Sequence, residues 1–142
     1  KIWVFNTHLD HVGNEAQLKG MQLILKKIAT LNTDDFPVIV MGDFNFGDSE
    51  VEAAAISQRF KDLWLTLKNN KRGYTWDMER NILARDHAYE KETSRRLDRI
   101  LVNHYSWKPV KVKITGKRPI YVRRGKLYPS DHFALIGTVT RM

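Results

Sequence analysis

Six side chains with acid–base or metal-binding chemistry stand at the ends of apolar stretches of the sequence: His8, Asp43, Asn45, Asp98, Asp131 and His132. An aspartate beside a histidine fixes the tautomer of the imidazole ring and stabilises its protonated form. Carboxylates, an amide oxygen and imidazoles also suit a hard divalent cation such as Mg²⁺ or Mn²⁺. Together these groups could bind a phosphoryl group from several sides. No serine or cysteine stands near a base in a comparable pattern, so the residues favour direct attack by water.

The stretch VIVMGDFN, residues 38–45, positions two of these side chains. Its continuous apolar run is typical of a central strand buried on both faces. Gly42 can release the backbone where the strand ends. Asp43 and Asn45 lie two positions apart and therefore face one side of an extended chain. Open α/β sheets bind ligands beyond the carboxyl ends of their strands, although Gly, Asp and Asn are also ordinary turn residues.

A second apolar run, residues 2–9 (IWVFNTHL), predicts another buried strand with His8 at its tip. The intervening segment has one apolar helical face, and Asn14 with Gln17 fits a capping box at its start. Strand, helix and strand in this order form a βαβ unit with parallel strands. His8 is therefore expected close to Asp43 and Asn45.

The remaining segments predict a mixture of strands, helices and loops. Ser49 with Glu52 fits a second capping box, opening a helix through residue 55. Residues 60–67 are apolar enough for core, with helix and strand both open, and residues 77–96 read as a long charged loop with at most one helical turn. Further strands are expected at residues 97–102, 110–115, 120–122 and 133–139. The segment 110–115 alternates apolar residues with lysine, as half-exposed antiparallel strands do.

Composition and charge bound the class of protein. The 142 residues suffice for one domain, and the net charge of +8 is concentrated in residues 68–126, with 17 basic and 6 acidic side chains. Such an excess favours a phosphate, nucleic-acid or anionic membrane partner over a merely solvated surface. There is no cysteine, no visible signal peptide and no apolar run of membrane-spanning length, which favours an intracellular protein with the compartment left open.

Four short motifs occur in a characteristic order: NTHL at residues 6–9, GDFN at 42–45, LDRI at 97–100 and SDH at 130–132. In this order, each at a strand end, they resemble the endonuclease/exonuclease/phosphatase family over nearly the whole chain. The segment GYTWD (residues 73–77), Asn81, PSDH and the stretch QLKGMQLILKKI are most similar to the 5′-tyrosyl-DNA phosphodiesterase branch.

The resemblance implies an α/β fold, namely the C-terminal half of a four-layered α/β sandwich with a mixed β-sheet. It also implies Mg²⁺-dependent (or Mn²⁺-dependent) phosphodiester hydrolysis, at DNA ends. By motif, His8 contacts the scissile phosphate, Asp43 activates or orients the attacking water, and Asn45 positions water or a phosphate oxygen. Asp98 holds His132, which stabilises the transition state. Asp131 lies by the metal, and Trp76 and Leu83 belong to the wall against which the DNA end packs. From the residues alone, Trp76 could equally be a core aromatic or a stacking platform.

Two departures from the family pattern matter. Gly47 stands where the branch carries a basic residue, which puts that phosphate contact in doubt. The family's first half, with an Asn or Gln at one strand tip and a metal-binding Glu, has no counterpart. Residues 1–142 are therefore interpreted as a single partial domain that needs its N-terminal half or self-associates. We expect one sheet face to be covered by the first helix and residues 63–67, and the other to lie against the missing half.

Two alternatives to a DNA-end hydrolase stay open from the sequence. One is a hydrolase of another phosphoester, such as a sphingolipid, an inositol phosphate or RNA. The other is a non-catalytic basic half-domain that binds nucleic acid, which the missing Glu favours. Turnover of a panel of phosphodiesters with Mg²⁺ separates these classes.

Overall fold

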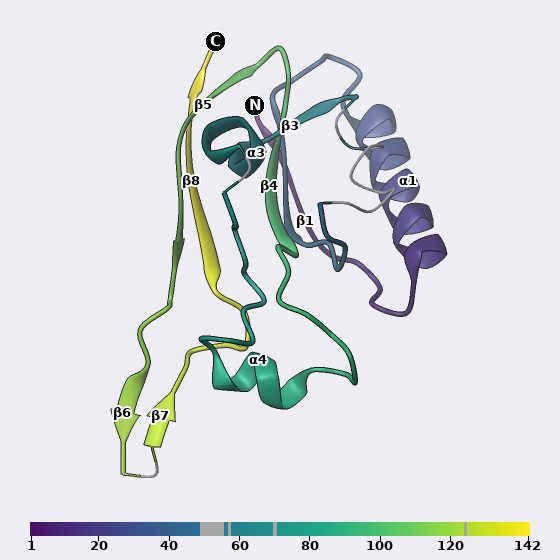
Figure 1. Ribbon diagram of the computed structural model, residues 1–142. Coiled ribbons are helices and arrows are strands. Elements are labelled where there is room, and N and C mark those ends of the chain that lie inside the picture. Colours follow the sequence, from purple (N-terminus) through teal and green to yellow (C-terminus); the bar gives the residue numbers. More distant parts are fainter. Residues whose placement is uncertain (49–55, 57, 70, 124) are drawn as a thin grey trace.

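The computed structural model describes residues 1–48, 56, 58–69, 71–123 and 125–142, so the helix expected from Ser49 to residue 55 lies outside the described residues (Figure 1). Its main sheet has the strand order β1-β2-β4-β3. These strands are β1 (Trp3–His8), β2 (Val38–Asp43), β4 (Asp98–Asn103) and β3 (Phe60–Asp62). β1 and β2 are parallel, whereas β4 is antiparallel to both β2 and β3. The predicted α/β class with a mixed sheet is confirmed.

Helix α1 (Asn14–Leu31) joins the two parallel strands, as the predicted βαβ unit requires. The predicted capping box is wrong, because the helix begins one residue early and Gly13 occupies the N-cap without a side-chain hydrogen bond. Gln17 is instead buried, and its amide Nε2 donates to the backbone carbonyl of Asn45 at 2.9 Å. The first turn of α1 thus supports the polar loop that follows β2.

Elements of the chain itself pack on both faces of the sheet, although they do not cover the second face completely. α1 packs on one face, in a core that contains Met21, Val38, Val40 and Leu101. The other face carries α3 (Leu63–Lys68) and the antiparallel pair β5 (Trp107–Thr115) and β8 (Ala134–Arg141), as Figure 1 shows. The expectation that α1 and residues 63–67 cover the same face is therefore wrong. Successive β4 residues point to opposite faces of the sheet, so Leu101 faces α1 and Val102 faces the other way. α3 follows the edge strand β3 directly and packs on the face to which Val102 points.

The remaining elements refine the sequence prediction. Residues 60–67 contain both of the structures left open, since β3 ends at Asp62 and α3 begins at Leu63. The charged segment holds one short helix, α4 (Ile82–His87). β6 (Ile120–Val122) and β7 (Gly125–Leu127) form a hairpin that projects from the body of the protein (Figure 1). Within the described ranges, no helix is long and apolar enough to cross a membrane.

The layers seen in this chain are α1, the main sheet, and then α3 with β5 and β8. The full four-layered sandwich stays a prediction. On the sheet face opposite α1, Val4 of the edge strand β1 and Met41 of β2 remain 53% and 37% exposed. That face is therefore covered over β4 but not over β1.

Candidate active site

The polar strand ends meet at one edge of the main sheet. In the parallel pairing of β1 with β2, His8 lies opposite Asp43. In the antiparallel pairing of β2 with β4, Asp43 lies opposite Asp98. Three neighbouring strands therefore deliver three of the predicted catalytic residues side by side, because two strands end and one begins at this edge.

His132 completes the cluster from the segment just before β8. Its Nδ1–H donates to Asp98 Oδ2 at 2.7 Å, while its Nε2 lies 3.7 Å from Asp43 Oδ2. On the other side, His8 Nε2 lies 3.4 Å from the same Asp43 oxygen. The side chains of Asp43, Asp98 and His132 are largely buried, whereas that of His8 is 75% exposed. We call His8, Asp43, Asp98 and His132 the pocket cluster.

Burial and neighbouring charges shift the proton affinities of this cluster. Burial, together with the charge of Asp98, raises the pKa of Asp43 above its ordinary value, although its hydrogen bond from the Asn45 N–H and the two histidines oppose this. For His132, burial lowers the pKa, but the hydrogen bond to Asp98 and the charges of Asp98 and Asp43 outweigh it, so the pKa is raised. The site therefore favours a protonated imidazole next to a carboxylate that holds its proton more tightly than usual.

The loop after β2 is fixed by hydrogen bonds at every side. The Asn45 N–H donates to Asp43 Oδ1 at 2.8 Å, and the Asn45 side-chain Nδ2 donates to the Leu9 carbonyl at 2.7 Å. Asn45 adopts a left-handed backbone with φ of 56°, which these contacts stabilise. Gly42 passes so close to β1 that a Cβ there would lie 1.9 Å from the Thr7 carbonyl oxygen. The GDFN motif thus serves backbone geometry as well as chemistry.

Trp76 is both a core residue and part of the pocket wall. Its side chain is 7% exposed and packs with Ala84 and Leu97, while its ring centroid lies 5.1 Å from that of His132. The neighbouring Thr75 Oγ1 accepts hydrogen bonds from the backbone N–H groups of Leu97 and Asp98. Residues 75–76 therefore join the start of β4 to the segment that carries His132. The core placement of Trp76 is confirmed, and its role as a stacking platform stays a prediction.

Leu83 lies in α4, half-buried, and does not line the pocket that holds the other candidate residues. The structure therefore does not bring it to the pocket cluster, and its contact with substrate stays a prediction.

Asp131 contacts His87, a residue that the sequence did not indicate. His87 Nδ1 lies 3.0 Å from Asp131 Oδ2, and the Ser130 hydroxyl donates to Asp131 Oδ1 at 3.1 Å. Burial raises the pKa of Asp131, but these two hydrogen bonds and the charge of His132 outweigh it, so the pKa is lowered. Because His87 lies in a segment without apolar periodicity, only the Asn81 N-cap signal before α4 could have located it.

Asn81 connects α4 to the segment that precedes His132. Its side chain is fully buried, and Oδ1 accepts from the Leu83 N–H at the helix start. Its Nδ2 donates to the carbonyls of Ser130 and Asp131 at 2.8 and 3.0 Å. Asn81 therefore holds the backbone of residues 130–131, which immediately precede His132.

A divalent cation fits these residues only incompletely. In the part of the chain that the structure describes, no group of three or more His, Asp or Glu side chains is placed to hold a metal ion. The Asp131 carboxylate, the predicted metal ligand, is already engaged by His87 and Ser130. The described residues alone therefore do not form a complete metal centre.

The pocket cluster opens into a pocket of about 610 Å³, which is the size range of small-ligand sites. Residues with hydrogen-bonding side chains dominate its described lining beyond the cluster: Asn6, Thr7, His11, Asn45, Trp76, His87, Tyr89, Glu92, Arg95, Ser130 and Asp131. The pocket therefore suits a polar, phosphate-bearing ligand better than an apolar one.

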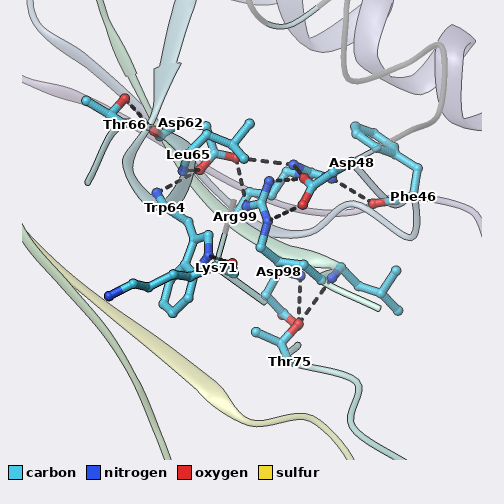
Figure 2. Close-up of polar contacts among 12 residues, drawn as sticks. Phe46, Asp48, Asp62, Trp64, Leu65, Thr66, Lys71, Thr75, Asp98 and Arg99 are labelled. Carbon is cyan, nitrogen blue, oxygen red and sulfur yellow. Dashed lines mark hydrogen bonds and ion pairs between the residues drawn. The ribbon is translucent and has the colours of Figure 1, made fainter. Parts of the chain in front are cut away.

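Behind the pocket, four charged side chains form what we call the buried ion network: Asp48, Asp62, Arg96 and Arg99. Arg96 donates to Asp62 at 2.8 Å and to both Asp48 oxygens, and Arg99 donates to Asp48 at 2.9 Å and to the Phe46 carbonyl at 2.9 Å. Asp62 also accepts from the Trp64 and Leu65 N–H groups and so caps α3 (Figure 2). The network fastens the loop after β2, the start of α3 and the start of β4 to one another.

At its strand ends, this α/β sheet thus gathers a chain of contacts from Asp98 through His132 to Asp43, beside an asparagine that holds the adjoining loop. The chain belongs to the Endonuclease/Exonuclease/phosphatase family, whose model matches residues 5–132. Members of this family hydrolyse phosphoester bonds.

Solved structures support this assignment. A protein of unknown function from Enterococcus faecalis V583 is 26% identical, with a TM-score of 0.67 over 98% of this chain and 50% of that chain. TDP2 of D. rerio, solved with a single-strand DNA product, is 25% identical, with a TM-score of 0.72 over 96% and 55%. The mannosyl-6-phosphatase Bt3783 of Bacteroides thetaiotaomicron, at 22% identity and a TM-score of 0.72 over 96% and 50%, shares the fold.

This chain thus spans about half the length of the solved structures that it matches. No curated protein matches it significantly.

Proposed function

We propose that this chain supplies the aspartate and histidine side of a site that hydrolyses phosphodiesters at DNA ends. The observation that carries the proposal is the Asp98–His132–Asp43 chain, which faces a polar pocket at the strand ends. Its groups match the needs of phosphoryl transfer, in which positioning and charge stabilisation supply most of the rate.

In the proposed reaction, Asp43 accepts a proton from a water molecule whose oxygen forms a new bond to phosphorus. The ester bond to the leaving oxygen breaks, and His132 donates the proton that this oxygen takes up. Asp98 keeps the His132 ring oriented through its 2.7 Å contact, so that Nε2 faces the pocket. The exposed His8 contacts a phosphate oxygen, and Asn45 holds the Asp43 loop in place. The raised pKa values of Asp43 and His132 suit these roles.

Two observations support nucleic acid as the substrate. Residues 99–130 contain no acidic side chain and carry much of the positive charge of the chain. TDP2 of D. rerio, solved with a single-strand DNA product, is among the structures similar to this chain. The affinity of a basic surface for a polynucleotide rises with the number of phosphates that it contacts.

Activity of this kind also requires a divalent cation, Mg²⁺ or Mn²⁺, in our proposal. The described residues do not complete a metal centre, so further ligands would come from a partner half that supplies the rest of the domain. This observation also favours the second candidate function, a half-domain that binds nucleic acid without hydrolysing it.

The partly bare sheet face indicates where a partner half packs. Val4 and Met41 are exposed on the side of β1 and β2 opposite α1, and β1 is the edge strand of the sheet among the described residues. Apolar residues at an unpaired sheet edge invite association with another sheet. We expect the chain alone to self-associate in light scattering, and Val4→Lys to reduce that association. A monomer at all concentrations would contradict this proposal.

A turnover assay tests the function. The chain is incubated with Mg²⁺, with and without the complementary half, on a 5′-tyrosyl oligonucleotide, RNA, sphingomyelin and an inositol phosphate. We expect hydrolysis of the DNA substrate only in the presence of both halves, and its loss with EDTA. Binding of DNA without turnover in any combination would favour the binding half-domain instead, and preference for another phosphoester would change the substrate class.

A further inference from the structure

A second pocket, of about 570 Å³, lies between the loop after α3 and the segment that precedes β4. We infer that it is a second phosphate subsite, which binds the backbone of a polynucleotide beyond the phosphate held in the candidate active site. The inference rests on the proposed function, and it specifies the substrate as a chain with several phosphates.

The described lining of this pocket is strongly basic. Lys71, Arg72, Arg95 and Arg96 all contribute to it. Asp48 is the only acidic residue among the described lining residues, and its carboxylate is already bound by Arg96 and by Arg99 of the buried ion network. Arg96 is buried in that network, and Arg95 Nη2 lies 3.0 Å from Glu92 Oε1. Lys71 and Arg72 therefore carry the positive charge that remains for a ligand, and an anion is the ligand that complements it.

The loop that carries Lys71 and Arg72 is anchored rather than merely exposed. The Trp64 indole Nε1–H donates to the Lys71 carbonyl at 2.8 Å. A Cβ at Gly73 would lie 2.4 Å from the Trp64 ring and 2.9 Å from Arg96 Cδ, so the backbone packs directly on both side chains. The Arg72 guanidinium lies 5.9 Å from the ring centroid of Tyr74, which also lines the pocket. An anchored backbone has less conformational freedom to lose when its side chains bind an anion than a free loop has.

Arg95 lines both this pocket and the candidate active site, so the two pockets adjoin. A ligand with one phosphate can occupy only one of them. A polynucleotide carries phosphates at regular intervals along its backbone and can occupy both, and the aromatic Tyr74 offers a surface for one of its bases. The observations therefore favour a polynucleotide over a sugar phosphate or a lipid head group.

The test compares the binding of short and long ligands by the chain itself. Fluorescence anisotropy measures the affinity for a fluorescent 5′-phosphorylated octathymidylate, and competition with the labelled octamer measures that for thymidine 5′-monophosphate. In Lys71→Ala/Arg72→Ala, we expect about tenfold weaker octamer binding and a salt slope lower by about 2, with mononucleotide binding unchanged. Both side chains are exposed, so thermal unfolding should not change.

The matched control is Lys26→Ala/Lys27→Ala, which removes two exposed cations of α1, outside the basic segment of residues 68–126. We expect this variant to keep nearly all of its octamer affinity. Equal losses in the two double variants, or an equal loss for the mononucleotide, would overturn the subsite. Failure of the proposed function is distinguishable, because a subsite-dependent octamer affinity without any hydrolysis would leave this inference standing.

Discussion

The buried ion network and the pocket cluster lie on opposite sides of the start of β4, and they differ in how completely their charges are paired. In the network, two aspartates and two arginines are matched, and Arg96 and Arg99 are each only 2% exposed. In the pocket cluster, Asp43 Oδ1 accepts from the Asn45 N–H, but its Oδ2 lies 3.4 and 3.7 Å from the two histidines, and the pKa of Asp43 is raised. The neighbours Asp98 and Arg99 belong to different clusters because successive strand residues point to opposite sides. Saturated charges hold the fold, whereas unsaturated charges are available to a ligand.

The largest expected effect is on stability, from Asp62→Ala in the buried ion network. This change leaves two buried guanidinium groups short of a partner and removes both hydrogen bonds that cap α3. We expect the free energy of unfolding to fall by about 3–5 kcal/mol, measured by denaturant unfolding. A loss below about 1 kcal/mol would show that the network does not hold the fold.

The next effect is on chemistry, from Asp43→Asn or His132→Ala in the pocket cluster. With both halves and Mg²⁺ present, we expect the hydrolysis rate to fall by about a hundredfold or more. Unfolding should change little, because these groups lie at strand tips outside the apolar cores. Activity retained in either variant would contradict the catalytic role of that residue. A large loss of stability would show that the pocket cluster, like the buried ion network, stabilises the fold.

A smaller effect is expected from Asp48→Asn. The Asp48 side chain is 44% exposed, so water compensates for part of what its arginine partners lose. We expect a loss of about 1 kcal/mol in the free energy of unfolding, which is well below that of Asp62→Ala. Denaturant unfolding of the two variants side by side measures the difference. Equal losses would mean that burial does not set the energetics of the network.

The smallest effect concerns the pH dependence of stability. Because the folded-state pKa of His132 is raised above 6.5, folding favours its protonated form. This contribution is fully present below pH 6.5 and is lost as the pH rises through the raised pKa. We expect the stability advantage of the wild type over Asp98→Asn to follow that course. NMR titration of the His132 ring should show a lower midpoint in Asp98→Asn. An unchanged midpoint would mean that Asp98 does not control the imidazole.

The sequence predicted the elements whose signals are local. The runs ending in His8 and Asp43 read as parallel strands because each is apolar and a long amphipathic helix lies between them. Asp98 and His132 were identified by their motifs, and the 2.7 Å contact between them agrees with the role expected of Asp98.

What the sequence did not reveal depends on pairing between distant segments. Arg96 contacts Asp48 and Asp62 across 48 and 34 positions, and no local pattern encodes such contacts. Gln17 fitted a cap by spacing, yet the loop after β2 offered it a buried carbonyl instead. The motif around Asp131 placed this residue beside a metal ion. Its contact with His87 could not be predicted, because His87 lies in a segment without apolar periodicity.

The late position of His132 in the chain has a consequence for assembly. β1, α1 and β2 connect residues near in sequence, whereas His132 is held by the Phe133 N–H bond to the Thr75 carbonyl and by β8, which pairs with β5. On the ribosome the N-terminal segments emerge first, so both carboxylates of the pocket cluster are made before their shared imidazole. The reactive constellation should thus be the last part of this chain to form during biosynthesis. Hydrogen exchange of ribosome-bound chains of increasing length, with protection of β1 and β2 appearing before that of β8, measures this order.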